Sequence, residues 1–352
     1  MADITEKLQQ TVLNAAAEKR ALQLIGSGSK TFYGRTPVGE PLVLAEHTGI
    51  INYQPKELVI TARAGTPLSE IQAALAEQGQ MLACEPPQFA EGGTIGGAVA
   101  AGLSGPARPY TGSVRDFVLG TRIINGKGEI LRFGGEVMKS VAGYALSRLM
   151  CGALGTLGLL LDVSIKVMPV NQAEQTRVLT CTESEALSRI AELGRKPLPI
   201  TAASFIDGQL YLRLSGAEAA VSSAAEQIGG EPLNNAAQFW VELRDFKHEF
   251  FQGAEPLWRL SLPAIAPSLQ SDGAQLIDWG GAQRWLRGEQ DPEQLRSQVA
   301  ALGGHAVLFR GGDRNSDVFH SLQSALLGFH KKLKQALDPA GIFNPGRLYA
   351  EF

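Results

Sequence analysis

The feature that most constrains this chain of 352 residues is the placing of its glycines. Residues 139–158 read as a helix-like run that ends in glycines and leads into an apolar strand at residues 159–167. Two earlier segments, GSGSK at residues 26–30 and EGGTIGG at residues 91–97, form similar glycine-dense turns. Because glycine has no side chain, backbone N–H groups in such turns can approach a pyrophosphate closely. Three such turns predict one long ligand that contacts all of them.

The composition excludes several classes of protein. With 32 basic and 35 acidic residues, the formal net charge is −3, which does not favour binding to nucleic acid or a polybasic membrane anchor. The mean hydropathy of −0.01 is typical of a soluble globular chain, and no apolar run reaches the roughly 20 residues of a spanning helix. Its charged N-terminus is unlike an export signal. Cys84, Cys151 and Cys181 are far apart, which predicts a reducing compartment, no structural disulfide and no CxxC metal site.

The first half of the chain reads as mixed α+β. Thr66 is expected to cap a helix that has Pro67 at its first position and ends at Gly79. An NGKG turn at residues 125–128 predicts a hairpin between strands 118–124 and 129–133. Further strands are expected at residues 22–25, 42–45 and 58–64.

The composition changes after Pro169, which predicts a second unit. Its expected elements follow the order β-α-β-β-α, which is typical of a ferredoxin-like sandwich. They are a strand at 177–181, a helix at 184–193, a hairpin at 203–214 that turns at Asp207-Gly208, and a helix at 217–228. Later elements are a strand at 258–262, a hairpin around 279–281, a helix at 292–302, a strand at 305–309 and a helix at 316–337.

Four blocks in this order resemble flavoproteins of the vanillyl-alcohol-oxidase/p-cresol-methylhydroxylase (PCMH) type. They are residues 26–30, 93–102, 110–116 and 155–158, and the chain closes with DP at 338–339 and NPGR at 344–347. Additional matches at residues 84–87, 112–124, 133–139 and 275–281 are similar to one family of this type along the whole chain. That family comprises the FAD-binding subunits of glycolate dehydrogenases, which are also called glycolate oxidases.

The resemblance implies an α+β, two-domain PCMH-type FAD-binding fold with a smaller ferredoxin-like α+β cap. Residues 1–170 would form the FAD-binding domain, residues 171–330 the cap, and residues 331–352 a C-terminal segment that returns to the first domain. It also implies a cytoplasmic oxidoreductase subunit, peripherally associated with the inner membrane through its complex. Its partners would be a larger, paralogous flavin subunit and an iron–sulfur subunit. The complex would oxidise glycolate, with D-lactate as a candidate second substrate, and pass electrons to the respiratory chain.

By the same resemblance, FAD would be bound by the glycine-rich blocks and the tail. Residues 26–29 would cradle one phosphate, Thr94, Gly96 and Gly97 would make a second contact, and residues 112–113 and 155–158 would line the adenine and ribityl side. The predicted FAD-binding residues are Gly26, Ser27, Gly28, Ser29, Pro86, Gly93, Thr94, Gly96, Gly97, Gly102, Gly112, Ser113, Gly155, Thr156, Gly158, Leu159 and Asn344. The first cradle contains neither His nor Cys, which predicts non-covalent FAD. For any single glycine, a plain turn is the alternative.

No catalytic residue can be named from the sequence. Oxidation of a 2-hydroxy acid needs a base, usually His, and an Arg for the carboxylate. The five histidines (His47, His248, His305, His320 and His330) are isolated, which predicts structural or surface roles and no metal site. Ala145 stands where related flavoproteins often have Asp.

Two further questions stay open at this point. The chain is interpreted as an FAD subunit of a complex, with a stand-alone 2-hydroxy-acid dehydrogenase and a non-enzymatic assembly partner as alternatives. An aromatic-rich stretch at residues 239–258 forms either a core or a docking surface for a partner.

Overall fold

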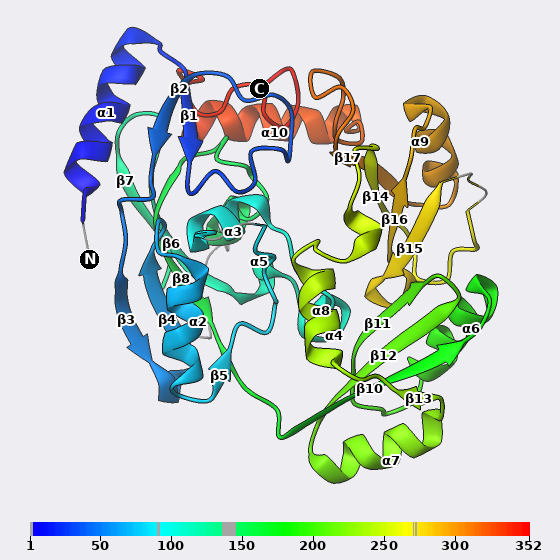
Figure 1. The fold of residues 1–352 in the computed structure, drawn as a ribbon. Coiled ribbons are helices and arrows are strands. Elements are labelled where there is room, and N and C mark those ends of the chain that lie inside the picture. Colours follow the sequence, from blue (N-terminus) through cyan, green and yellow to red (C-terminus); the bar gives the residue numbers. More distant parts are fainter. Residues whose placement is uncertain (1–2, 90–91, 136–145, 270, 272) are drawn as a thin grey trace. The chain divides into compact units, whose positions relative to one another are not determined.

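The computed structural model describes residues 3–89, 92–135, 146–269, 271 and 273–352. The chain forms two compact units (Figure 1). Unit 1 consists of Met1–Leu103, Ser113–Pro169 and Asp313–Phe352, and unit 2 of Ser104–Gly112 and Val170–Gly312. Residues 104–112 therefore pack with unit 2 and residues 313–330 with unit 1. That residues 1–170 are the FAD-binding domain, residues 171–330 the cap and residues 331–352 a returning C-terminal segment stays a prediction.

Unit 1 is built around a five-stranded antiparallel sheet in the order β3-β4-β8-β6-β7. Its helices are α1 (Thr5–Glu18), α2 (Leu68–Ala76), α3 (Ile95–Ala101), α5 (Val114–Phe117), α10 (Ser324–Leu337), η1 (Pro55–Glu57) and η2 (Leu146–Met150). Its strands are β1 (Leu22–Ile25), β2 (Glu40–Val43), β3 (Ile50–Gln54), β4 (Val59–Arg63), β5 (Gln80–Met81), β6 (Val118–Ile124), β7 (Ile130–Gly134), β8 (Leu159–Lys166) and β9 (Met168–Pro169). Strands β1 and β2 form a separate parallel pair.

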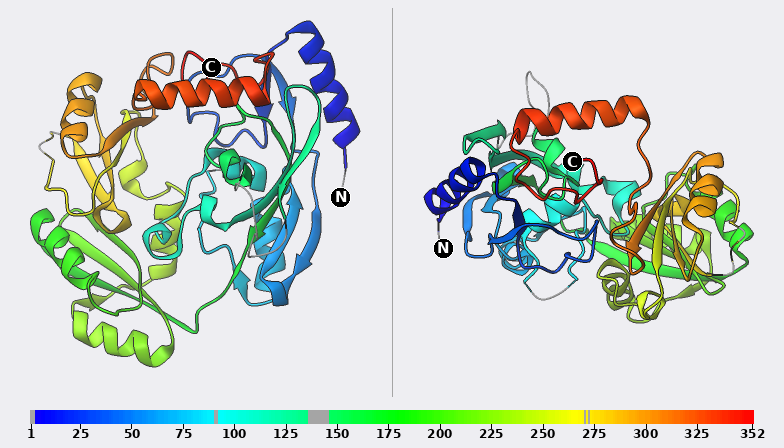
Figure 2. Two further views of the ribbon diagram at one scale, coloured as in Figure 1. Left: turned by 180° about the vertical axis from the view of Figure 1, so that it is seen from behind. Right: turned by 90° about the horizontal axis from the view of Figure 1, so that it is seen from above.

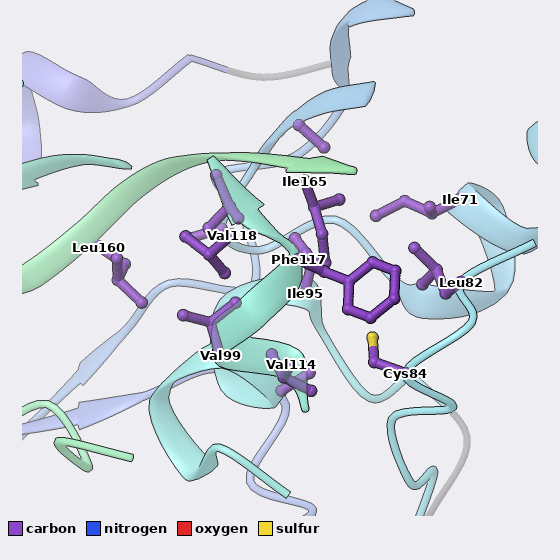
Figure 3. Packing of buried hydrophobic residues seen from close by; sticks show 14 of the residues in the cluster. Ile71, Leu82, Cys84, Ile95, Val99, Val114, Phe117, Val118, Leu160 and Ile165 are labelled. Atoms are coloured by element: carbon purple, nitrogen blue, oxygen red, sulfur yellow. The ribbon is translucent and has the colours of Figure 1, made fainter. Parts of the chain in front are cut away.

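The main core of unit 1 lies between this sheet and helices α2, α3 and α5. Strand β8 is central, and every residue from Leu159 to Ile165 is buried, including the polar Asp162 and Ser164. Figure 3 shows side chains of α3, α5 and β8 pointing toward one another. A second core joins Leu8 and Val12 of α1 to the C-terminal Phe343. The predicted strand at residues 159–167 and the hairpin at residues 118–133 are confirmed.

The start of α2 differs from the prediction. The helix begins at Leu68 with Pro67 as its N-cap, and Thr66 does not cap it. Instead, the Thr66 hydroxyl accepts a hydrogen bond from the Gly49 N–H at 2.9 Å, and the Leu68 N–H donates to the Gly93 carbonyl at 2.7 Å. The capping prediction was wrong because neighbouring loops supply these partners.

The C-terminal helix is also shorter than predicted, since α10 begins at Ser324 rather than at residue 316. Upstream, the Asp313 carboxylate accepts from the Asn315 N–H at 2.9 Å, and the Asp313 carbonyl accepts from the Ser316 hydroxyl at 2.6 Å. Arg35 additionally donates to the Ser316 carbonyl. These local bonds compete with helical ones and hold the segment as a turn.

The helix-like run predicted at residues 139–158 is only partly visible. Residues 139–145 lie outside the described residues, and from Leu146 the chain forms the short η2 instead of an α-helix. Leu154 and Gly155 then adopt positive φ values of 48° and 73°, so the chain turns sharply before β8. The α-helical prediction was wrong for residues 146–158.

Unit 2 contains an eight-stranded sheet in the order β13-β10-β12-β11-β15-β16-β14-β17. Its strands are β10 (Ala173–Thr180), β11 (Ile200–Ile206), β12 (Gln209–Gly216), β13 (Glu231–Pro232), β14 (Leu257–Ser261), β15 (Ala274–Asp278), β16 (Gln283–Arg287) and β17 (His305–Arg310). Its helices are α4 (Arg108–Thr111), α6 (Glu183–Leu193), α7 (Glu218–Ile228), α8 (Ala236–Arg244), α9 (Pro292–Ala301), η3 (Glu249–Phe251) and η4 (Trp279–Gly281).

This sheet is two ferredoxin-like sheets joined at one edge. Strands β10 to β13 follow the element order β-α-β-β-α-β and the spatial order 4-1-3-2. Strands β14 to β17 repeat this spatial order, and β11 pairs with β15 across the join. The predicted ferredoxin-like unit is confirmed for β10 to β13, whereas β14 to β17 repeat its strand order without a helix in the described residues between β14 and β15. Asp207 and Gly208 have φ values of 47° and 78°, as an Asp-Gly hairpin turn requires.

Most of the aromatic residues between 239 and 309 pack against one another in a core rather than on an exposed surface. Phe246 stacks on Phe309 with ring centroids 5.0 Å apart, and Trp285 meets Phe251 edge to face at 5.5 Å. Trp240 is buried and donates to the Thr176 hydroxyl at 2.9 Å. Packing is therefore the observed role of this cluster.

The C-terminal segment completes unit 1 beside the first strand. The Leu22 N–H donates to the Ile342 carbonyl at 2.7 Å, and the Asn344 N–H donates to the Leu22 carbonyl at 2.9 Å. The views in Figure 2 show this red segment beside the blue β1. Residues near the two ends of the sequence thus lie side by side in unit 1. In the described part of the chain, no helix is both long and apolar enough to cross a membrane.

Candidate functional site

A cavity opens in unit 1 where β1, α3 and the C-terminal segment meet. It is lined by residues from each of the sequence blocks at 26–30, 93–102 and 155–158, and by the tail. The predicted FAD-binding residues that line it are Gly26, Ser27, Gly28, Ser29, Thr94, Gly96, Gly97, Gly155, Gly158 and Asn344. Residues more than 300 positions apart in the sequence, such as Gly26 and Asn344, therefore line the same cavity.

The turn after β1 forms the first wall. A Cβ atom on Gly26 would lie 2.7 Å from Thr94 Oγ1, so a larger residue does not fit there. Gly28 has a φ of +78°, which favours glycine. Within the described residues, the N–H groups of residues 27–30 donate to no protein acceptor. Four amides on one short turn are thus available to an anionic ligand.

The second wall is the start of α3, and its amides are already occupied. Thr94 is the N-cap, and its hydroxyl accepts from the Gly97 N–H at 3.1 Å. The Gly96 N–H donates to the Ala64 carbonyl at 2.9 Å, and a Cβ on Gly96 would lie 2.6 Å from the Ala64 Cβ. Gly96 therefore lets α3 pack closely against the end of β4. In this structure, the walls made by Gly96 and Gly97 contribute shape rather than free N–H donors.

The third wall joins the turn at residues 154–158 to the tail. Asn344 has a φ of +41°, and its side chain bridges two backbone groups. Its Oδ1 accepts from the Leu24 N–H at 2.8 Å, and its Nδ2 donates to the Leu154 carbonyl at 2.6 Å. A Cβ on Gly155 would lie 2.6 Å from that Nδ2. Asn344 thus holds the wall together, because its Oδ1 and one N–H of its Nδ2 are each bonded to the backbone.

Seven predicted residues do not line the cavity: Pro86, Gly93, Gly102, Gly112, Ser113, Thr156 and Leu159. Several have other local roles. Leu159 belongs to the core around α1, and Gly102 ends α3 with a φ of +64°. Ser113 forms a capping box with Asp116 at the start of α5, and Gly112 lies in unit 2. The glycine pattern alone could not separate such turns from cavity walls.

Two cations for which no role was predicted, Lys30 and Arg347, also line the cavity. Arg347 donates to the carbonyls of Thr31 at 2.8 Å and Tyr33 at 2.6 Å, and also to that of Arg35. Burial lowers the pKa of Arg347 to about 10, and that of Lys30 to about 8. Among the described lining residues there is no Asp or Glu. The position of Lys30 directly after GSGS was the signal available in the sequence.

This arrangement suits a long, anionic, partly aromatic ligand. Unbonded amides and a lysine lie at one wall, and apolar side chains such as Leu24, Leu44 and Leu160 line other parts of the cavity. Ligand sites commonly combine an apolar lining with a few polar groups that fix orientation. The residues present therefore fit a flavin dinucleotide.

The other candidate reactive residues have structural surroundings. His47 is fully buried and accepts from the Ile4 N–H at 3.3 Å, and His248 accepts from the Phe250 N–H at 3.2 Å. Burial raises the thiol pKa of Cys84 and of Cys151 to about 12, and all three cysteines are free. In the described ranges, no cluster of three or more His, Cys, Asp or Glu side chains could hold a metal ion.

Comparison with known proteins agrees with this cavity. Residues 2–134 match the family described as FAD binding domain. The chain is 50% identical over 349 residues to the glycolate oxidase subunit GlcE of Escherichia coli (strain K12), covering 99% of this chain and 98% of that protein. It is 28% identical to the glycolate oxidase subunit GlcD of Bacillus subtilis (strain 168), over 50% of this chain and 38% of that protein.

The fold has a solved counterpart as well. p-Cresol methylhydroxylase with bound substrate superposes with a TM-score of 0.74 at 16% sequence identity, covering 99% of this chain and 88% of the other. The predicted PCMH-type FAD-binding fold is thereby confirmed. With half of its residues identical to GlcE from end to end, and with a matching FAD binding domain, the chain belongs to the family of the glycolate oxidase subunit GlcE.

Proposed function

We propose that this chain is the FAD-carrying subunit of a glycolate-oxidising enzyme complex. The observation that carries the proposal is its 50% identity with a glycolate oxidase subunit over nearly the whole of both chains. The cavity of unit 1 supports the flavin part, because its amides and its cations suit the diphosphate of FAD.

The proposed reaction is the oxidation of glycolate to glyoxylate, with D-lactate as a candidate second substrate. Bound FAD supplies the chemistry, since a flavin accepts a hydride from a carbon that bears a hydroxyl group. The electrons would then pass to the respiratory chain. The partners would be a larger, paralogous flavin subunit and an iron–sulfur subunit, and the weaker similarity to GlcD supports a paralogous partner. The complex would lie on the cytoplasmic face of the inner membrane.

We propose that the ten predicted residues lining the cavity contact FAD or shape its binding site. The other seven would act indirectly, through the local structure around the cavity, as Leu159 does through the core around α1 and Gly102 through the end of α3. The described lining contains neither His nor Cys, which supports non-covalent attachment. Denaturing the FAD-loaded protein should therefore release FAD completely, so that the polypeptide has the mass calculated from its sequence alone. A polypeptide that keeps the mass of FAD after denaturation would contradict this.

Co-expression with the candidate partner chains tests the function. The intact assembly should contain this chain together with its partners, and anaerobic glycolate should bleach its flavin absorbance. The variant Gly26→Val, whose side chain would collide with Thr94, should remove one flavin per copy of this chain without preventing assembly. The control Gly328→Val lies on α10, where a Cβ meets no neighbour within 4 Å, and should keep the full flavin count.

The alternatives predict other results. If the isolated chain alone bleaches its flavin with glycolate, it is a stand-alone dehydrogenase. If the chain is colourless and Gly26→Val leaves the flavin count and activity of the assembly unchanged, it is a non-enzymatic assembly partner.

A further inference from the structure

Lys30 places a charged group at the meeting point of two walls of the cavity. Its side chain is half-buried, and its Nζ lies 3.4 Å from the Ser29 hydroxyl. The same Nζ lies 5.8 Å from the centroid of the Phe89 ring and 4.0 Å from the position that a Cβ on Gly97 would occupy. The ammonium group therefore lies between the turn at residues 26–30 and the start of α3.

The ammonium of Lys30 has no carboxylate partner among the residues that the structure describes. The other buried cations near the cavity are differently bonded. Arg347 is held by backbone carbonyls, and Lys334 is paired with Asp338 at 2.7 Å. Taking an ammonium group out of water without a counter-charge is unfavourable. An anion bound in the cavity would supply that counter-charge.

We propose that the Lys30 ammonium binds the diphosphate of FAD and makes the cavity select the dinucleotide over an uncharged flavin such as riboflavin. This inference rests on the FAD binding included in the proposed function, and it does not depend on glycolate as substrate. The N–H groups of residues 27–30 supply dipoles on the same wall, whereas Lys30 supplies a full positive charge. Lys30 would thus determine affinity and specificity without taking part in the oxidation.

A pH dependence follows from this placement. Burial lowers the pKa of Lys30 in the ligand-free cavity to about 8, and the negative charge of a diphosphate would raise it again. Below about pH 8 the lysine is already charged, so the affinity for FAD should not change with pH. Above that pH a proton must be taken up on binding, and the affinity should fall by up to about tenfold per pH unit. Arg347, the other titratable residue in the described lining, stays charged in this range because its pKa is about 10.

The test is a titration of the flavin-free, full-length chain with FAD and with riboflavin between about pH 7 and about pH 9, followed by flavin fluorescence and calorimetry. At pH 7, Lys30→Gln should weaken FAD binding by roughly 10- to 100-fold, as expected for a lost hydrogen bond to a charged group, and should leave riboflavin binding unchanged. Lys30→Arg, which stays charged, should restore most of the affinity and remove the pH dependence. The exposed Lys56→Gln is the charge-matched control and should behave as the wild type.

Two results would overturn the proposal. One is a Lys30→Gln variant with native circular dichroism that binds FAD as tightly as the wild type. The other is an equal loss of FAD and riboflavin affinity, which would indicate a damaged cavity rather than a lost charge. Failure of the wild-type chain to bind FAD under any condition would instead contradict the flavin part of the proposed function, so the two failures are distinguishable.

Discussion

At the scale of single residues, the cavity depends on positions where the size and the hydrogen bonds of one side chain decide whether the walls can form. Asn344 combines a positive φ with a side chain that bonds two backbone groups from distant segments. Asn tolerates the left-handed conformation better than most residues, which suits it to this position. The glycines act in the opposite way, because they leave room where a Cβ atom would collide.

Replacing Asn344 should destabilise the fold and release FAD. Asn344→Ala leaves the Leu24 N–H and the Leu154 carbonyl without their partner, which we expect to cost about 1–3 kcal/mol. Asn344→Gly loses the same bonds but tolerates the φ of +41°, so it should be less destabilising than Ala by about 1 kcal/mol. Urea unfolding and the rate of FAD loss measure both effects. Equal stability of the wild type and both variants would disprove this role.

Gly96 and Gly328 form a matched pair for a second test. A Cβ on Gly96 would lie 2.6 Å from Ala64, so Gly96→Ala should push α3 from β4 and destabilise by about 1–3 kcal/mol. Gly328 lies in exposed α10 with open space around it, so Gly328→Ala should stabilise by up to about 1 kcal/mol. Thermal unfolding of both variants measures these changes in stability. A Gly96→Ala variant as stable as the wild type would contradict the prediction and show that α3 can shift away from β4 at no cost.

At the scale of elements, α10 is fastened to the cavity by a buried ion pair. Lys334 donates to the Asp338 carboxylate at 2.7 Å, to the Thr156 carbonyl at 2.7 Å and to the Phe343 carbonyl at 2.9 Å. Asp338 also accepts from the N–H groups of Ile342 and Phe343. Both charges are therefore fully bonded, and they connect the last helix to the turn that precedes β8.

Removing one member of this pair should be far worse than removing both. Lys334→Met leaves the buried Asp338 carboxylate uncompensated and should cost about 3–5 kcal/mol, whereas adding Asp338→Asn should recover part of the loss. The exposed i,i+4 pair of Lys196 and Glu192 is the control, and Lys196→Met should change stability little. A double-mutant cycle by urea unfolding measures the coupling. A coupling free energy near zero would contradict the arrangement.

At the scale of the whole molecule, the two units differ in how the sequence is distributed over them. Unit 2 repeats one ferredoxin-like strand order and joins the repeats through β11 and β15. Unit 1 is assembled from three separate stretches of sequence, and its cavity forms only because the tail returns to β1. A cofactor site of this kind depends on the complete fold of unit 1, which is why the glycine blocks are so widely spaced.

Much of the fold could be predicted because local signals agreed with the tertiary structure. The Asp207-Gly208 turn, the hairpin around residues 125–128 and strand β8 could each be predicted from the residue types within the element itself. The predictions for Thr66 and for the start of α10 were wrong where a distant or competing hydrogen bond decided the local conformation. Such bonds leave no periodic pattern in the sequence.

The sequence by itself indicated the type of ligand: the glycine-rich turns predicted one long ligand with a pyrophosphate, and the resemblance of the ordered blocks and the closing NPGR to PCMH-type flavoproteins implied FAD. Only the tertiary structure decided which of these residues share a cavity, that the amides of Gly96 and Gly97 are occupied, and that Lys30 lies beside the free amides of residues 27–30. The physical reason is that turn chemistry depends on neighbouring residues, whereas hydrogen-bond partners and burial depend on segments that meet only in the folded chain.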